Sequence, residues 1–148
     1  LRFMGSDGTN LRINVDTGET IVDGSLHFAE GDANADADFT VVATAYINSI
    51  GSPDATAMYD IEWSMMSLLQ QTAPNDGTLE TRGMLGIDDA DAIAFDIFAK
   101  EIDMNTAYLV ANMTLYTVDL QSGAATEVGM IDGLDVALRD VAVWHEGM

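Results

Sequence analysis

AIAFDI, at residues 92–97, opens a series of four short apolar runs that continues with TAYLV (106–110), LYTVDL (115–120) and TEVGMI (126–131). Each run is rich in β-branched and aromatic residues, and polar or glycine-containing turns separate them, as between short antiparallel strands. Gly123 stands in the turn between the third run and the fourth. Four successive strands of this kind predict one four-stranded blade of a β-propeller.

The opening run of this predicted blade returns near the C-terminus, where residues 138–143 read LRDVAV. Asp140 then takes the place of Asp96, about 40 to 50 residues downstream, which is the usual period of a blade. Because the aspartate recurs at one place in the repeat, we expect it to hold a structural hydrogen bond rather than to act in catalysis.

Earlier parts of the chain repeat other pieces of the blade. MYDIE (58–62) is similar to LYTVD (115–119), and INVDTG (13–18) is similar to VDLQSG (118–123). These echoes predict an all-β, β-propeller-like fold of about three four-stranded antiparallel blades. The prediction places blade-like units at about residues 1–28, 39–87 and 92–133 of a single domain, 1–148, with a closing strand at 138–143.

One segment of the middle unit is ambiguous. Residues 63–71 carry Met65, Met66, Leu68 and Leu69, a spacing that fits either a helical turn or a strand. We expect a strand that continues from Tyr59, because this interpretation needs fewer elements.

The charge balance restricts the partners of the chain. Its 148 residues include 25 Asp and Glu but only 5 Lys and Arg, a formal net charge of −20, which repels nucleic-acid phosphates and anionic lipid headgroups. We therefore expect no nucleic-acid partner, and a salty environment suits such a surface because cations screen its self-repulsion.

No apolar run approaches the roughly 20 residues of a membrane span, so no membrane-spanning segment is expected. The absence of cysteine excludes disulfides and thiolate chemistry.

An acidic loop is the candidate metal site. Oxygen-bearing side chains alternate along it, at Asp32, Asn34, Asp36 and Asp38. Calcium favours such spacing, because alternate residues of a curled loop point several oxygens inward. The pattern is incomplete, since calcium loops carry glycine where this chain has Ala37 and a bidentate glutamate where it has Ala43. The alternative is an exposed loop whose side chains cap their own backbone.

Catalytic patterns are weak. His27 and His145 are the two histidines, and neither lies in a nucleophile motif, so we assign no catalytic residue. We expect a non-catalytic binding or structural interaction module. The alternative is a divalent-metal-dependent or carbohydrate-active hydrolase, because so many acids leave room for a catalytic carboxylate pair.

Several segments are similar to those of a known family, namely GTNLRIN (8–14) followed by DTG (16–18), GDANA (31–35), PNDGTL (74–79), and LYTVD (115–119) with Gly123. On these residues, nearly the whole chain resembles the C-terminal part of the bacterial family called domain of unknown function 4394. The resemblance implies propeller-like repeats, further blades upstream, and often export, hence an extracellular or periplasmic location. It implies no activity. Val15 and Asp36 depart from the family pattern, which has proline and glycine at these places.

Three blades do not close a ring, and the exposed edges of open sheets invite association. We expect a homodimer in which residues 138–143 of each chain pair with residues 1–4 of the other, so that two half-rings make six blades. The contact is then isologous. The alternative is an irregular sandwich or a fragment of a longer protein.

Overall fold

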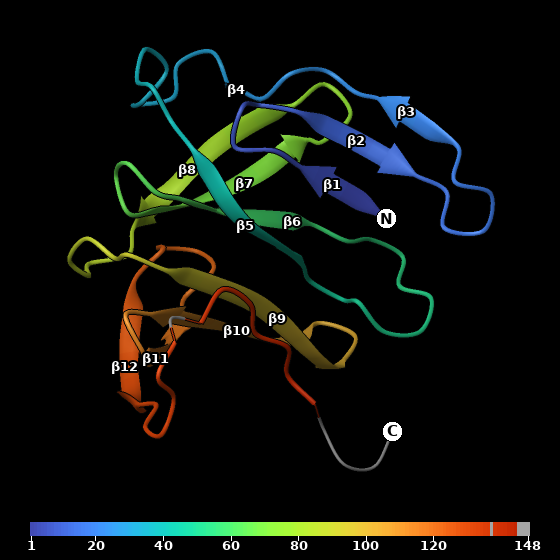
Figure 1. The fold of residues 1–148 in the computed structure, drawn as a ribbon. Helices are drawn as coiled ribbons and strands as arrows, with labels where there is room; N and C mark the ends of the chain where they lie inside the picture. The colour runs from blue at the N-terminus through green and yellow to red at the C-terminus, as the bar shows by residue number, and fades with distance from the viewer. Residues whose placement is uncertain (137, 145–148) are drawn as a thin grey trace.

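The computed structural model describes residues 1–136 and 138–144, and Figure 1 shows their arrangement. The prediction of an all-β fold is confirmed, because these residues contain strands and turns but no helix. No helix long and apolar enough to cross a membrane occurs among them either. The strands are β1 (Arg2–Met4), β2 (Asn10–Ile13), β3 (Thr20–Val22), β4 (His27–Phe28), β5 (Val41–Tyr46), β6 (Met58–Glu62), β7 (Ser67–Ala73), β8 (Thr78–Met84), β9 (Ile93–Glu101), β10 (Met104–Ala111), β11 (Thr114–Val118) and β12 (Ala125–Met130).

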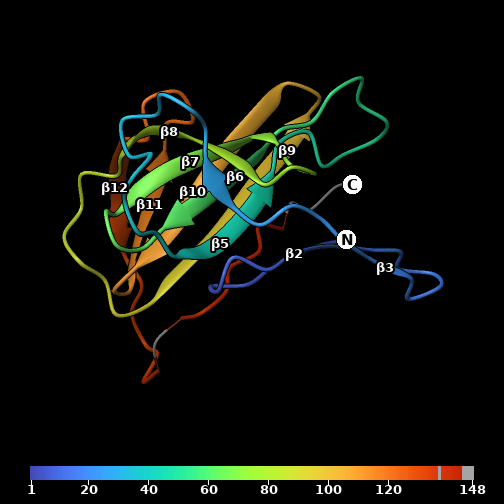
Figure 2. The ribbon, with the colours of Figure 1, turned by 90° about the horizontal axis from the view of Figure 1, so that it is seen from above.

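The strands form three open sheets that follow one another along the chain. The first has the order β1-β2-β3, the second β4-β8-β7-β6-β5, and the third β12-β11-β10-β9. Neighbouring strands are antiparallel except β4, which pairs with β8 in parallel. The two larger sheets stack on each other, and the view from above shows β2 and β3 extending to one side of them (Figures 1 and 2).

Two segments that resemble each other in sequence form the same turn. In INVDTG, the side chain of Asn14 accepts hydrogen bonds from the backbone N–H groups of Asp16 and Thr17. In VDLQSG, the carboxylate of Asp119 accepts them from the second and third residues after it in the same way. Each turn then closes on a glycine in the left-handed region, with φ of 75° at Gly18 and 78° at Gly123.

The expected continuous strand through residues 63–71 is wrong, and the segment is not a helix. The chain reverses direction between β6 and β7, and Glu62 pairs with Ser67 across the hairpin. The Glu62 carboxylate is fully buried and accepts hydrogen bonds of 2.7 Å from the N–H groups of Ser64 and Met65. A third bond comes from Thr40, before β5. A buried acid therefore closes this turn, a role that apolar periodicity does not reveal.

Each face of the second sheet contributes to a core. The larger core lies between the second and third sheets and includes Ile61, Leu68, Phe95, Ile97 and Leu109. The smaller core, on the side of β4, consists of Leu26, Phe28, Val41, Leu69 and Leu79. Alternating inward residues of adjacent strands supply both cores, as antiparallel pleating requires.

The predicted closing strand is not formed within the single chain. Residues 138–144 have no strand pairing, although the N–H of Val143 donates a 2.9 Å hydrogen bond to the carboxylate of Asp96 on β9. Pairing of this segment with a second chain stays a prediction.

Candidate functional site

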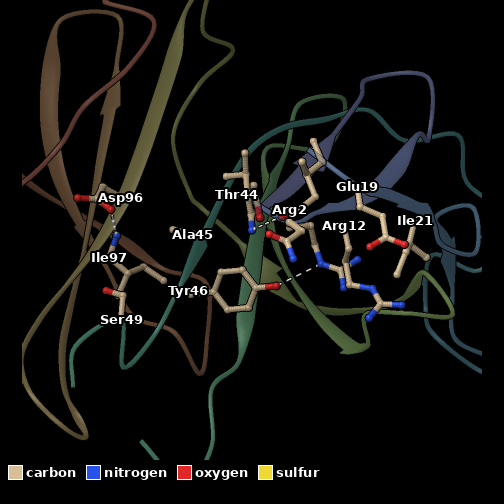
Figure 3. A pocket seen from close by; sticks show the side chains of 13 residues that line it. Arg2, Arg12, Glu19, Ile21, Thr44, Ala45, Tyr46, Ser49, Asp96 and Ile97 are labelled. Carbon is tan, nitrogen blue, oxygen red and sulfur yellow. Dashed lines mark hydrogen bonds between the residues drawn. The ribbon is translucent and has the colours of Figure 1, made fainter. Parts of the chain in front are cut away.

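A pocket of about 800 Å³ lies where the first sheet meets β5 and β9, which are edge strands of the second and third sheets. Its walls come from β1 and β2, from Thr44 to Tyr46 on β5, and from Asp96 and Ile97 on β9. In Figure 3 the side chains of Arg2 and Tyr46 stand between Asp96 on one side and Arg12 with Glu19 on the other. The pocket is therefore lined by charges of both signs and by apolar side chains, among them Leu1, Ile21 and Ile97.

The wall formed by β1 is an unpaired strand edge. Among the described residues, β1 pairs with β2 alone. Leu1 exchanges two backbone hydrogen bonds with Ile13, of 3.0 Å and 2.8 Å. Because alternate residues of an antiparallel strand face the same partner, the backbone groups of Arg2 and Met4 face away from β2, toward the open side. This edge is a template for another strand.

Arg2 anchors the first sheet to the second. Its guanidinium donates to the Tyr46 hydroxyl at 3.2 Å, to the Asp23 carboxylate at 2.9 Å and to the carbonyl oxygen of Pro74 at 3.1 Å. It also donates to Asn10, which is itself bonded to the Pro74 carbonyl. The Arg2 side chain is only 6% exposed, so it serves the structure rather than a ligand.

Asp23 forms a second ion pair, with Arg12 on the pocket side. Arg12 donates to both of its carboxylate oxygens, at 2.8 Å and 2.9 Å. The hydrogen bond from Arg12, and after it the one from Arg2, hold the pKa of Asp23 below its usual value. The Arg12 side chain stays 42% exposed and is accessible from the pocket.

Asp60 is a buried acid behind the pocket. It lies on β6 opposite Thr44, and Gln71 donates to its Oδ2 atom at 2.8 Å. Burial raises the pKa of Asp60 to about 6, against the opposing effects of hydrogen bonding and of the Arg2 charge. No pattern in the sequence distinguishes this acid from the exposed ones, and the sequence prediction missed it.

The four residues of the candidate metal loop do not come together. Thr81 on β8 donates to both carboxylate oxygens of Asp32, through its N–H at 2.7 Å and its hydroxyl at 2.9 Å. Asn34 donates to the same hydroxyl, and its N–H also bonds to Asp32. Asp36 and Asp38 are exposed. Within residues 1–136 and 138–144, no three His, Cys, Asp or Glu side chains form a metal-binding group. The loop is thus hydrogen-bonded to Thr81 on β8. Calcium binding stays a prediction.

The repeated aspartates make the same local hydrogen bond. Asp96 accepts from the N–H of Ile97, and Asp140 from the N–H of Val141, each at 2.9 Å. His27 is exposed and contacts the Ser25 carbonyl. His145 lies outside the described residues.

Comparison with known proteins identifies one family. The family described as "Domain of unknown function (DUF4394)" matches residues 1–142. No curated protein and no solved structure matches the chain.

Proposed function

Because the chain belongs to the DUF4394 family, whose description carries no activity, we propose its function from the geometry, as a non-catalytic structural interaction module of β-propeller type. In this proposal each sheet acts as a blade, and the free edge of β1 accepts a strand from a second copy. The supporting observation is the unpaired edge of β1 inside a pocket walled by β5 and β9. Strand addition to an open sheet edge is a common mode of recognition.

The position of the pocket fits a missing strand. The second and third sheets end in β5 and β9, and both of these strands line the pocket. Among the described residues, the first sheet ends in β1. A strand added beside β1 would therefore lie next to the place where β5 and β9 meet.

Residues 138–143 fit as the donated strand. Asp140 and Asp96 each accept a hydrogen bond from the next N–H, so the segment already shares a local feature with the middle of β9. The segment also carries one charge of each sign, Arg139 and Asp140, and the pocket offers Glu19 and Arg12 as opposite charges. Strand exchange between two copies then forms an isologous dimer.

The test is the solution mass of the full chain and of two truncated chains, measured by light scattering or sedimentation. We expect the full chain to be a dimer and a chain that ends at residue 135 to lose dimerisation, because the donated strand is gone. A chain that ends at residue 143 keeps the strand and is the matched control. If the full chain has the mass of a monomer, or if the dimer survives removal of residues 136–148, the proposal is overturned.

A further inference from the structure

Two glycines, separated by five residues, occupy corresponding places in the three sheets. The pairs are Gly18 and Gly24, Gly77 and Gly83, and Gly123 and Gly129. The first glycine of each pair lies in a turn, with φ of 75°, 80° and 78° in the three sheets. The second lies at or just beyond the end of the strand that follows. Gly83 pairs with Leu68 and Gly129 with Leu115, beside a register shift in both hairpins.

The second glycine of one sheet packs against the first glycine of the next. A Cβ atom on Gly77 would lie 2.5 Å from the carbonyl oxygen of Gly24, and one on Gly24 would overlap the backbone of Asp76. A hydrogen bond of 2.9 Å from Gly24 N–H to the Asn75 carbonyl completes the contact. We call this contact between a strand-end glycine and a turn glycine the glycine joint.

The same joint connects the second sheet to the third. A Cβ atom on Gly123 would lie 2.5 Å from the carbonyl oxygen of Gly83, and one on Gly83 would overlap the backbone of Ser122. Both turn glycines in these joints, Gly77 and Gly123, are buried. Two sheets therefore approach backbone to backbone at each joint, which only glycine permits.

Within residues 1–136 and 138–144, two halves of the joint remain free, one in the first sheet and one in the third. A Cβ atom on either Gly18 or Gly129 would meet nothing within 4 Å. Exposed apolar side chains flank both, with Val15 (74% exposed) and Val22 (77%) near the turn, and Val128 (59%) and Met130 (72%) beside Gly129. The first sheet presents a free turn, and the third sheet presents a free strand end.

We propose that these two halves bind each other between two copies of the chain, so that Gly129 of one copy packs on the Gly18 turn of the other. The chain itself supplies the argument for this occupant, because it forms the same contact twice within its own stack. In a two-fold dimer each copy contributes one turn and one strand end, which makes two joints and leaves none free.

The position of the proposed donated strand agrees with this arrangement. Gly83 precedes β9, the opening strand of the sheet that Gly83 contacts through the joint. Gly129 likewise precedes residues 138–143, the strand proposed to open the first sheet of the second copy. The inference rests on the proposed function and adds a second contact surface, distinct from the edge of β1.

Gly18→Asn tests the joint, with Gly8→Asn as the matched control. Asparagine tolerates the left-handed conformation, and both glycines have positive φ and open space around them, so both variants should fold alike. We expect Gly18→Asn to raise the dissociation constant of the dimer roughly 100-fold or more, because the new side chain overlaps the partner backbone in two joints. Gly8→Asn, in a turn away from the joint, should change the constant less than about threefold. Sedimentation measures both constants, and thermal melting verifies that the variants fold.

The outcomes separate the joint from the strand exchange. A Gly18→Asn chain that dimerises like Gly8→Asn overturns the joint, and if removal of residues 136–148 still abolishes the dimer, the proposed function stands. A full chain with the mass of a monomer overturns both the glycine joint and the strand exchange. Loss of the dimer in Gly18→Asn with retention in Gly8→Asn supports the joint.

Discussion

Asp60 shows how one buried acid links the stability of the chain to pH. Its pKa is raised to about 6 in the folded state, whereas an exposed aspartate in the unfolded chain titrates near 3.8. The folded state therefore binds the proton more tightly than the unfolded state does. The Asp60 contribution to stability is fully present below about pH 4 and is lost as the pH rises through about 6.

Asp60→Asn should remove this loss, because the amide keeps the shape but carries no charge. We expect the free energy of unfolding at pH 7.5 to rise by on the order of 1–3 kcal/mol in the variant, with little change at pH 4. Urea unfolding between pH 4 and 7.5 measures the difference. Asp54→Asn also removes one negative charge, from an exposed position, and therefore controls for the less negative net charge of Asp60→Asn. Parallel pH curves for wild type and Asp60→Asn would contradict the assignment.

At this scale the sequence identified residues that repeat and missed residues that pair across sheets. Asp96 and Asp140 were recognised by their place in the repeat, and both make the structural hydrogen bond expected of them. Arg2 was missed, because its partners Tyr46 and Pro74 are distant in sequence. The glycine pairs have a constant spacing, but the spacing acquires meaning only when one sheet is seen to touch the next.

At the scale of strands and loops, local signals predicted the hairpins of the third sheet. The β-branched runs and the turn at Gly123 predicted the four strands of the third sheet close to their observed bounds. The turn between β6 and β7 was not predictable in this way, because a buried Glu62 closes it and glutamate normally signals exposure. The short parallel pairing of β4 with β8 also has no local signal.

The acidic loop gives a prediction at the same scale. A calcium ion at residues 32–38 has to draw the exposed Asp36 and Asp38 toward Asp32, which Thr81 already holds. We therefore expect a weak site, with a rise in melting temperature only near millimolar calcium, as in weak extracellular calcium modules. Calorimetry with calcium, and with magnesium for comparison, measures the shift. The double variant Asp36→Asn/Asp38→Asn should abolish it, and unchanged melting of the wild type at millimolar calcium would exclude the loop as a site.

At the scale of the whole molecule, glycine joints connect the first sheet to the second and the second to the third, and among the described residues the first and third sheets each keep a free half of this contact. The predicted all-β class is confirmed, whereas ring closure and dimerisation stay predictions, because both depend on a second chain. Charge is the main force against such an assembly, because each copy has a formal net charge of −20. Two copies must therefore approach against mutual repulsion.

Salt should strengthen the dimer for this reason. Raising KCl from about 0.1 M to 1 M shortens the screening length from roughly 10 Å to 3 Å, which removes most repulsion between exposed carboxylates on different copies. We expect the dissociation constant to fall by roughly tenfold or more over this range, measured by sedimentation. Sucrose is the control, because it favours compact states by exclusion from the surface without screening charge. A dissociation constant that rises with KCl would show instead that attraction across the interface, such as that proposed between Arg12 or Glu19 and the donated strand, outweighs the repulsion of the whole molecules.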